Sequence, residues 1–378
     1  MKIGVDYTAA YEQGAGIGRY VRELVRALAA QDQQTPYRLF VAGAAQNGLP
    51  PVPGPNFSWH PTRITPRWFA RIWYRLRLPL PVESFIGQVK LYHATDFTLP
   101  PTLPGVRTLL TVHDLSFVRA PETATPVLKA YLDKVVPRSV RRAFHVLADS
   151  QATKDDLVEL YGTPPEKITV LLSGVNAEFL PVKDATARKA VRERYGIPEK
   201  PYVFSIGTVQ PRKNYTRLIR ALAALGPPYD DVQLVIAGGR GWLESPIYQT
   251  VKDYHLSERV HFIGFAREED LPALYSGAAC MAYPSLYEGF GFPVLEAMAC
   301  GTPVITSTLS SMPEVAGDAA LLVDPYDMSA IADALERLLS DQTLCMNLVQ
   351  RGLAQAGQFT WQRTAQHLQD IYRWVLEQ

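Results

Sequence analysis

The stretch Tyr283-Pro-Ser-Leu-Tyr-Glu288-Gly-Phe-Gly-Phe-Pro-Val-Leu-Glu296-Ala-Met-Ala-Cys-Gly301 decides how the rest of the chain is interpreted. It begins at the end of an apolar run, Ala278 to Tyr283, which is typical of a buried strand. A glycine-rich turn follows, and Pro293 to Cys300 then has the pattern of a helix. Pro293 suits the first turn of a helix and Gly301 can end one. The stretch therefore predicts a strand, a loop and a helix in succession.

Both glutamates lie near the predicted start of that helix. Gly289 and Gly291 leave backbone N–H groups uncovered beside the positive end of the helix dipole, a place that binds phosphate or another anion. Carboxylates beside an anion site make sense if they accept hydrogen bonds from the hydroxyls of a sugar. A carboxylate stabilised by the dipole alone would explain one glutamate but not the repeated Gly-Phe pair. The stretch thus favours a site for a sugar that carries phosphate.

This combination resembles the nucleotide-sugar glycosyltransferases of family 4, whose signature is two glutamates separated by seven residues. Glu288 and Glu296 match that signature, and the match extends through Glu288-Gly-Phe-Gly-Phe-Pro and Ala299-Cys-Gly-Thr-Pro-Val-Ile305. The resemblance implies an α/β protein of GT-B architecture, with two Rossmann-like domains facing a central cleft and retention of anomeric configuration. It also implies that the donor contacts Glu288, Gly289, Phe290, Gly291, Phe292 and Glu296.

Composition sets broad limits on the class of protein. The 378 residues have room for two domains, and 47% hydrophobic with 20% charged residues is typical of a globular protein. A net charge of +1 argues against a nucleic-acid binder. Cys280, Cys300 and Cys345 fit neither a disulfide framework nor metal-ligand spacing. The chain starts directly on a predicted strand and holds no apolar run of transmembrane length, so we expect a cytoplasmic protein without a signal peptide.

Short apolar runs alternate with amphipathic stretches along the whole chain, a pattern typical of βα units and parallel sheets. The predicted strands are Ile3–Tyr7, Arg38–Ala42, Lys90–His93, Thr108–His113, His145–Ala148, Ile168–Leu172, Tyr202–Ile206, Gln233–Ala237, Val260–Ile263, Cys280–Tyr283, Pro303–Thr306 and Ala320–Val323. We expect an acceptor-side domain over residues 1–180, a linker over 181–200 and a donor-binding domain over 201–359. An amphipathic helix at 360–378, with Thr360 as its N-cap, is implied by the family resemblance to pack back on the first domain.

A glycine cluster, Gly14-Ala-Gly16-Ile-Gly18, precedes a predicted helix in the first domain. It could indicate a dinucleotide site, but the second predicted strand ends without the acidic residue that such a site uses to bind ribose. An NAD-dependent dehydrogenase is therefore disfavoured. The resemblance assigns Gly16 and Gly18 to close approach to the donor phosphate, whereas a plain strand-to-helix turn is the simpler alternative.

His113 ends another apolar run, where open α/β sheets bind ligands. A lone histidine is more often structural, but the resemblance implies that His113 contacts the donor sugar from the first domain. The neighbouring element Asp149-Ser150 also resembles the family, although Ser150 as a helix N-cap explains most of it locally.

Arg212 and Lys213 follow the first strand of the second domain, after the turn Gly207-Thr208. Arginine can bind phosphate oxygens through two parallel hydrogen bonds, and lysine binds them as a point charge. The resemblance gives this pair to the donor pyrophosphate, with Gly239 lining the nucleotide side. Because no Asp-x-Asp pair is available to hold a divalent cation, we expect a metal-independent transferase with no cofactor.

Five arginines and no acidic residue lie between Arg63 and Arg77, interleaved with aromatic side chains. Arg67, Arg71 and Arg75 repeat every fourth residue, which predicts a helix with a cationic face. Such a segment is typical of contact with an anionic membrane at the inner surface. An exposed basic face on an ordinary helix of the first domain is equally compatible with the pattern.

The functional hypothesis is a retaining transfer of a sugar from a nucleoside diphosphate to an acceptor hydroxyl, with His113, Arg212, Lys213 and Glu288 as the catalytic set. The loops most resemble bacterial mannosyltransferases of polysaccharide or glycolipid assembly, so GDP-mannose is the favoured donor, UDP-glucose the next, and a carbohydrate or lipid-linked molecule the acceptor. A nucleotide-sugar epimerase and a non-catalytic sugar-nucleotide binding protein are the alternatives. The first lacks the paired-glutamate loop, and the second does not account for the intact charged set.

Overall fold

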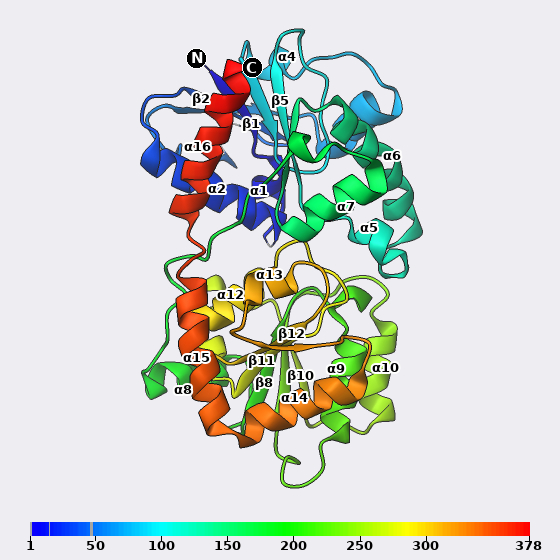
Figure 1. Ribbon diagram of the computed structural model, residues 1–378, viewed down its shortest axis with the longest axis vertical. Helices are drawn as coiled ribbons and strands as arrows, with labels where there is room; N and C mark the ends of the chain where they lie inside the picture. Colours follow the sequence, from blue (N-terminus) through cyan, green and yellow to red (C-terminus); the bar gives the residue numbers. More distant parts are fainter. Residues whose placement is uncertain (1, 15, 46–47) are drawn as a thin grey trace. The chain divides into compact units, whose positions relative to one another are not determined.

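The computed structural model describes residues 2–14, 16–45 and 48–378 (Figure 1). The chain forms two compact units. The first comprises residues 1–115, 126–174 and 360–378, and the second comprises 116–125 and 175–359. Residues 116–125 therefore group with the second unit, although the sequence analysis counted them in the first domain. One of the contacts responsible is a hydrogen bond of 2.7 Å from Trp242 Nε1 to the carbonyl of Thr123.

The first unit contains a seven-stranded parallel sheet in the order β3-β2-β1-β4-β5-β6-β7. Its strands are β1 (Ile3–Asp6), β2 (Tyr37–Ala42), β3 (Phe57–Thr62), β4 (Leu91–Ala94), β5 (Arg107–Val112), β6 (His145–Ala148) and β7 (Ile168–Val170). Strand β3 was not among the strands predicted from sequence. This strand lies at the edge of the sheet and contains Pro61, which an edge strand tolerates but which interrupts the apolar pattern.

The second unit contains a six-stranded parallel sheet in the order β10-β9-β8-β11-β12-β13. Its strands are β8 (Tyr202–Ile206), β9 (Gln233–Ala237), β10 (Val260–Gly264), β11 (Cys280–Tyr283), β12 (Val304–Ser307) and β13 (Leu321–Val323). All six were predicted from sequence. This is the doubly wound Rossmann order, in which the strand order reverses between β8 and β11, and ligands bind outside the carboxyl ends of the strands at such a point.

Helices connect the strands within both units. Those of the first unit are α1 (Thr8–Glu12), α2 (Ile17–Gln31), α3 (Pro66–Phe69), a π-helix (Ala70–Arg75), α4 (Glu83–Ile86), α6 (Pro126–Arg142), α7 (Gln151–Tyr161), the 3₁₀ turn η4 (Pro165–Lys167) and α16 (Trp361–Glu377). Those of the second unit are α5 (Ser116–Arg119), η3 (Pro121–Thr123), α8 (Ala185–Arg194), η5 (Pro211–Lys213), α9 (Tyr215–Ala224), α10 (Ser245–Asp253), η6 (Glu268–Asp270), α11 (Leu271–Ser276), α12 (Phe292–Ala299), α13 (Met312–Ala316), α14 (Met328–Ser340) and α15 (Gln342–Ala356). The predicted linker thus contains a helix, α8.

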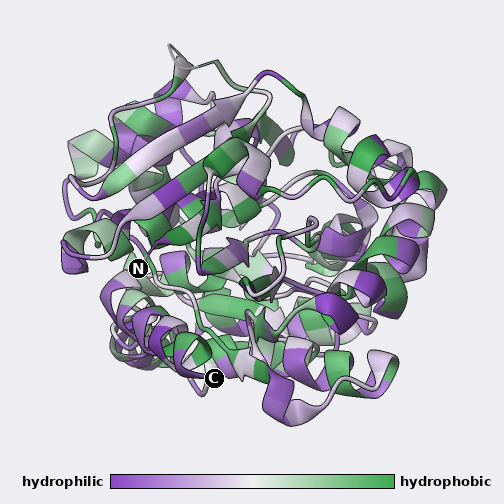
Figure 2. Cartoon of the chain, turned by 90° about the horizontal axis from the view of Figure 1, so that it is seen from above, coloured by the Kyte–Doolittle hydropathy of each residue, from purple (hydrophilic) through white to green (hydrophobic). Residues whose placement is uncertain are grey.

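Helices cover both faces of the second sheet. On one face α9, α10 and α14 form a hydrophobic core with the strands, in which Leu222, Ile236 and Leu335 are buried. On the other face Tyr275 of α11 packs edge-on against Phe204 of β8, with their ring centroids 5.1 Å apart. Figure 2 shows hydrophobic and hydrophilic residues alternating along the helices, as expected for helices that bury one face. This packing fixes the strand ends that carry the site.

The last helix, α16, packs beside α2 in the first unit (Figure 1). The side chain of Thr360 caps it by accepting from the backbone N–H of Arg363, as the sequence analysis predicted. At its far end Tyr372 lies 2.8 Å from Nδ1 of His93, whose Nε2 lies 2.8 Å from the hydroxyl of Thr111. His93 is therefore a structural histidine that joins β4, β5 and α16.

Candidate active site

Three of the predicted catalytic side chains meet at the point where the strand order of the second sheet reverses. Arg212 and Lys213 lie in η5, directly after β8, and Glu288 lies in the loop after β11. Arg212 Nη1 and Lys213 Nζ are each 2.7 Å from a different carboxylate oxygen of Glu288. Arg212 also donates to the carbonyl of Tyr287. The cationic pair and the glutamate therefore form one ionic cluster.

Tyr283, at the end of β11, completes this cluster, and the sequence analysis missed it. Its hydroxyl accepts a hydrogen bond from Lys213 and donates one of 3.0 Å to Glu288. Burial raises the pKa of Tyr283, and the charge of Glu288 raises it further, so the hydroxyl keeps its proton and can make both bonds. A tyrosine at the end of the strand that leads into the glutamate loop was the signal available in the sequence.

The charge of Glu288 is set by its neighbours. Burial alone would raise the pKa of this carboxyl, but the positive charges of Arg212 and Lys213 outweigh that effect and lower it from 4.5 to about 2. Glu288 is therefore ionised at neutral pH although only 7% of its surface is exposed. The cluster carries two positive charges and one negative charge, so it can attract an anion.

The loop that carries Glu288 is fixed by hydrogen bonds from the segment before α13. The backbone N–H of Glu288 donates to Ser310, and the hydroxyl of Ser311 lies within hydrogen-bond distance of the carbonyls of Glu288 and Phe290. Gly291 has a φ of 120° and directly precedes α12, which begins at Phe292. The N-terminus of an eight-residue helix thus follows the cluster within a few residues.

Two glycine loops lie against each other after β8 and β9. The N–H of Gly207 donates to Ala237 and that of Val209 to Gly239. A Cβ on Gly238 would lie 2.0 Å from the carbonyl oxygen of Gly207, so this position requires glycine. The predicted donor residues Gly207, Thr208 and Gly239 therefore belong to one loop pair beside the ionic cluster.

Glu296 lies in the interior of α12 and is only 2% exposed. One of its carboxylate oxygens accepts a hydrogen bond of 2.8 Å from the hydroxyl of Tyr275, which the sequence analysis also missed. Tyr275 is itself buried against Phe204, so it orients this carboxylate rigidly. The predicted contact of Glu296 with ribose hydroxyls stays a prediction.

His113 follows β5 in the first unit and pairs with Asp149, which follows the adjacent strand β6. Its Nδ1 lies 2.7 Å from a carboxylate oxygen of Asp149, and its Nε2 lies 2.8 Å from the carbonyl oxygen of Thr95. A backbone carbonyl and an ionised carboxylate can only accept hydrogen bonds. Both ring nitrogens of His113 must therefore donate, so the ring carries a positive charge. Its contact with a donor sugar stays a prediction, since both nitrogens already have partners.

The stability of the first unit should depend on the positive charge of His113. Burial tends to lower the pKa of His113, but the Asp149 carboxylate overcomes it and raises the pKa from 6.5 to about 9. A raised pKa contributes stability that is complete below pH 6.5 and is lost as the pH rises through 9, by roughly 3 kcal/mol in all. We expect urea unfolding to show this loss between pH 6.5 and 10 in the wild-type protein and a smaller one in His113→Gln. Equal losses in the two proteins would contradict the assignment.

The predicted phosphate loop of the first unit has a packing explanation. A Cβ on Gly18 would lie 2.1 Å from the carbonyl oxygen of Gln13 and 2.7 Å from that of Ala9, so the glycine permits α1 and α2 to pack closely. Gly16 has a φ of 50° and open space around it, which leaves room for a ligand. The donor contacts of both glycines stay predictions.

Gly18→Ala should therefore destabilise the protein, by about 1–3 kcal/mol, because the new methyl group displaces α1. Urea unfolding measures the effect. Gly239→Ala is the control, since a Cβ there meets nothing within 4 Å. An unchanged unfolding midpoint for Gly18→Ala would show that packing does not require this glycine.

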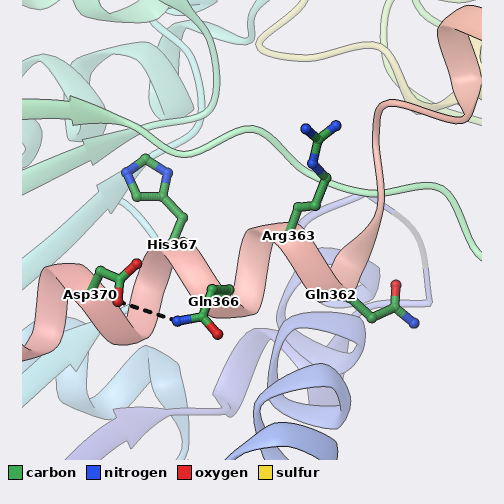
Figure 3. A pocket seen from close by; sticks show the side chains of 5 residues that line it. All are labelled: Gln362, Arg363, Gln366, His367 and Asp370. Atoms are coloured by element: carbon green, nitrogen blue, oxygen red, sulfur yellow. Dashed lines mark hydrogen bonds between the residues drawn. The ribbon is translucent and has the colours of Figure 1, made fainter.

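A metal-binding cluster or a surface depression would be another place for a site. Within residues 2–14, 16–45 and 48–378, no group of three or more His, Cys, Asp or Glu side chains is arranged to hold a metal ion. An open depression lies along the exposed face of α16 (Figure 3), and its lining residues are Gln362, Arg363, Gln366, His367 and Asp370. None of the predicted site residues lines it.

Similarity to known proteins identifies the family of this chain. Residues 14–179 match the family model described as Glycosyltransferase Family 4, and residues 187–355 match that of Glycosyl transferases group 1. The O-antigen chain mannosyltransferase B of Escherichia coli is 32% identical over 374 residues, covering 95% of this chain and 96% of that protein. The chain belongs to glycosyltransferase family 4.

Further relatives and solved structures resemble this glycosyltransferase. The O-antigen chain mannosyltransferase RfbU of Salmonella typhimurium is 31% identical and covers 73% of each chain. Among solved structures, sucrose-phosphate synthase from Thermosynechococcus elongatus has a TM-score of 0.76 at 22% identity, covering 100% of this chain and 99% of the other. Anabaena HepE in complex with UDP and glucose has a TM-score of 0.77 at 18% identity, with 99% of each chain covered. These structures confirm the predicted α/β fold of two Rossmann-like domains.

Proposed function

We propose that this glycosyltransferase is a retaining mannosyltransferase that moves mannose from GDP-mannose to an acceptor hydroxyl in polysaccharide or glycolipid assembly. The observation that carries the proposal is the cluster of Arg212, Lys213 and Glu288 at the reversal point of the second sheet. The choice of mannose is supported by the similarity along 95% of the chain to an O-antigen mannosyltransferase.

Donor cleavage breaks the bond between the anomeric carbon and the diphosphate oxygen. Negative charge then grows on the diphosphate, and positive charge grows on the sugar ring. Arg212, Lys213 and the N-terminus of α12 stabilise the departing diphosphate, so the proposed reaction needs no metal ion. Glu288 orients the hydroxyls of the sugar, and Glu296 those of the ribose.

Donor binding changes the partners of the cationic pair. Without a ligand, Glu288 neutralises much of the charge of Arg212 and Lys213. A bound diphosphate brings competing oxygens, so the two side chains share their hydrogen bonds between phosphate and carboxylate. The acceptor hydroxyl attacks from the face that the diphosphate leaves, and a phosphate oxygen takes its proton, as the family resemblance implies.

A donor panel tests the proposal. The protein is incubated with GDP-mannose, UDP-glucose and UDP-galactose, with and without chelator, in the presence of alkyl mannosides and glucosides as acceptors. We expect release of GDP from GDP-mannose at the same rate with chelator, and an α-mannoside product by NMR. Turnover of UDP-glucose alone would establish a glucosyltransferase instead. A product of inverted configuration, or a rate abolished by chelator, would refute the mechanism.

A further inference from the structure

Positive charge is concentrated in one part of the first unit. Residues 33–82 contain six arginines and no lysine, aspartate or glutamate, whereas the whole chain has a net charge of only +1. Five of the six lie between Arg63 and Arg77. The donor site described above uses none of them, so this concentration needs another explanation.

The segment that carries these arginines is anchored by aromatic side chains. Phe69 and Trp73 are 3% and 5% exposed, and their rings stack with centroids 4.1 Å apart. Both pack against Phe40 of β2 and against Phe85 of α4. The indole N–H of Trp73 donates to the carbonyl of Leu80. The backbone of the segment is therefore held in place by its buried face.

The helix is not the regular α-helix expected from the four-residue spacing of the arginines. It begins as α3 and continues as the π-helix Ala70–Arg75. A π-helix has a wider turn, with hydrogen bonds from residue i+5 to residue i, and the N–H of Leu76 accordingly donates to Arg71. Such turns often occur at functional sites.

The segment also exposes side chains, some cationic and some apolar. All five arginines are exposed, namely Arg63, Arg67, Arg71, Arg75 and Arg77. Between them Trp68, Leu76 and Leu78 are 55%, 64% and 48% exposed. The guanidinium of Arg71 lies 4.8 Å from the centre of the Trp68 ring. We call these eight residues the arginine face.

No carboxylate forms an ion pair with the arginine face among the described residues. The exposed carboxylate of Glu12 interacts electrostatically with Arg67 without forming an ion pair. Exposed leucines and an exposed indole lie among unpaired arginines, so the partner must offer both negative charge and a hydrocarbon phase. Nucleic acid offers charge and bases for stacking but no phase that accepts Leu76 and Leu78.

We propose that the arginine face binds the surface of a membrane that contains anionic phospholipid. The arginines bind the headgroup phosphates, Trp68 lies at the level of the headgroups, and Leu76 and Leu78 insert into the acyl boundary. No helix in the described part of the chain is long and apolar enough to cross a membrane. The proposal does not depend on which donor is used.

Vesicle sedimentation tests this proposal. The probe is vesicles of phosphatidylcholine with about one third phosphatidylglycerol, compared with vesicles of phosphatidylcholine alone. Each arginine near an anionic surface contributes a factor of about five in binding, so Arg67→Gln/Arg71→Gln/Arg75→Gln should bind the anionic vesicles about 100-fold more weakly. Leu76→Ser/Leu78→Ser should also bind more weakly, and high salt should weaken binding of the wild-type protein.

The control variant replaces three exposed arginines elsewhere in the first unit, Arg141→Gln/Arg363→Gln/Arg373→Gln, and should bind as the wild type does. Circular dichroism verifies that all variants are folded. Equal binding to neutral vesicles, an equal loss in the control, or no loss in the triple variant would overturn the proposal. The proposal would also be overturned if a single-stranded oligonucleotide bound through the same arginines and released the protein from the vesicles.

Discussion

Replacing Lys213 by alanine is expected to lower the rate of donor cleavage about 100- to 1000-fold, the usual effect of removing one preorganised donor to a developing negative charge. Lys213 is 8% exposed and lies against Tyr283 and Glu288, so its ammonium group is held in a nearly dry environment. Its charge acts more strongly on a departing diphosphate there than it would in water. The measurement is the rate of GDP release from GDP-mannose at saturating donor.

Lys200→Ala is the matched control for this experiment. Lys200 is also a lysine of the second unit, but its side chain is 48% exposed and pairs with Asp231 at the surface. We expect this variant to keep the wild-type rate. A Lys213→Ala enzyme that releases GDP as fast as the control would remove Lys213 from the chemistry.

Glu288→Gln should separate sugar transfer from nucleotide binding. The amide keeps the shape of the side chain but cannot neutralise the buried Lys213 and the partly buried Arg212, so the free energy of unfolding of the ligand-free protein should fall by roughly 3 kcal/mol. Arg212 and Lys213 are then available to the diphosphate, and GDP should bind at least as tightly as to the wild type. Transfer should still fall about 100-fold, because the oriented sugar contact is lost.

Three measurements together check this prediction: urea unfolding, calorimetric titration with GDP, and the transfer rate. In the double variant Lys213→Ala/Glu288→Gln, the loss of stability should be smaller than the sum of the two single losses, because the two side chains form one ion pair. Additive losses, or GDP binding weakened as strongly as transfer, would mean that Glu288 does not compete with phosphate for the cations.

The sequence was sufficient to predict most of the architecture, because parallel strands buried on both faces are continuous apolar runs. Leu234 to Ala237 and Cys280 to Tyr283 are clear examples, and both are fully buried. The run Phe57-Ser-Trp-His-Pro-Thr was missed because β3 is paired along one edge only and is mostly half-buried. The π-helix was missed because a four-residue spacing fits an α-helix nearly as well.

The site was predicted in its residue types but not in its pairing. Arg212, Lys213 and Glu288 were each assigned to the donor, yet nothing local indicates that a glutamate 75 residues after Lys213 is its partner. The same holds for His113 and Asp149, which are 36 residues apart and meet because β5 and β6 are neighbours. Tyr275 and Tyr283 contact the two glutamates through tertiary packing, which sequence spacing does not encode.

The central claim is that the diphosphate of the donor binds to the cluster of Arg212 and Lys213 at the carboxyl ends of β8 and β11. The most direct test is a crystal structure of the protein with GDP-mannose bound. We expect phosphate oxygens within about 3 Å of Arg212 and Lys213, with the sugar hydroxyls hydrogen-bonded to Glu288. A diphosphate that binds elsewhere, with the ion pairs from both cations to Glu288 unchanged, would contradict the account.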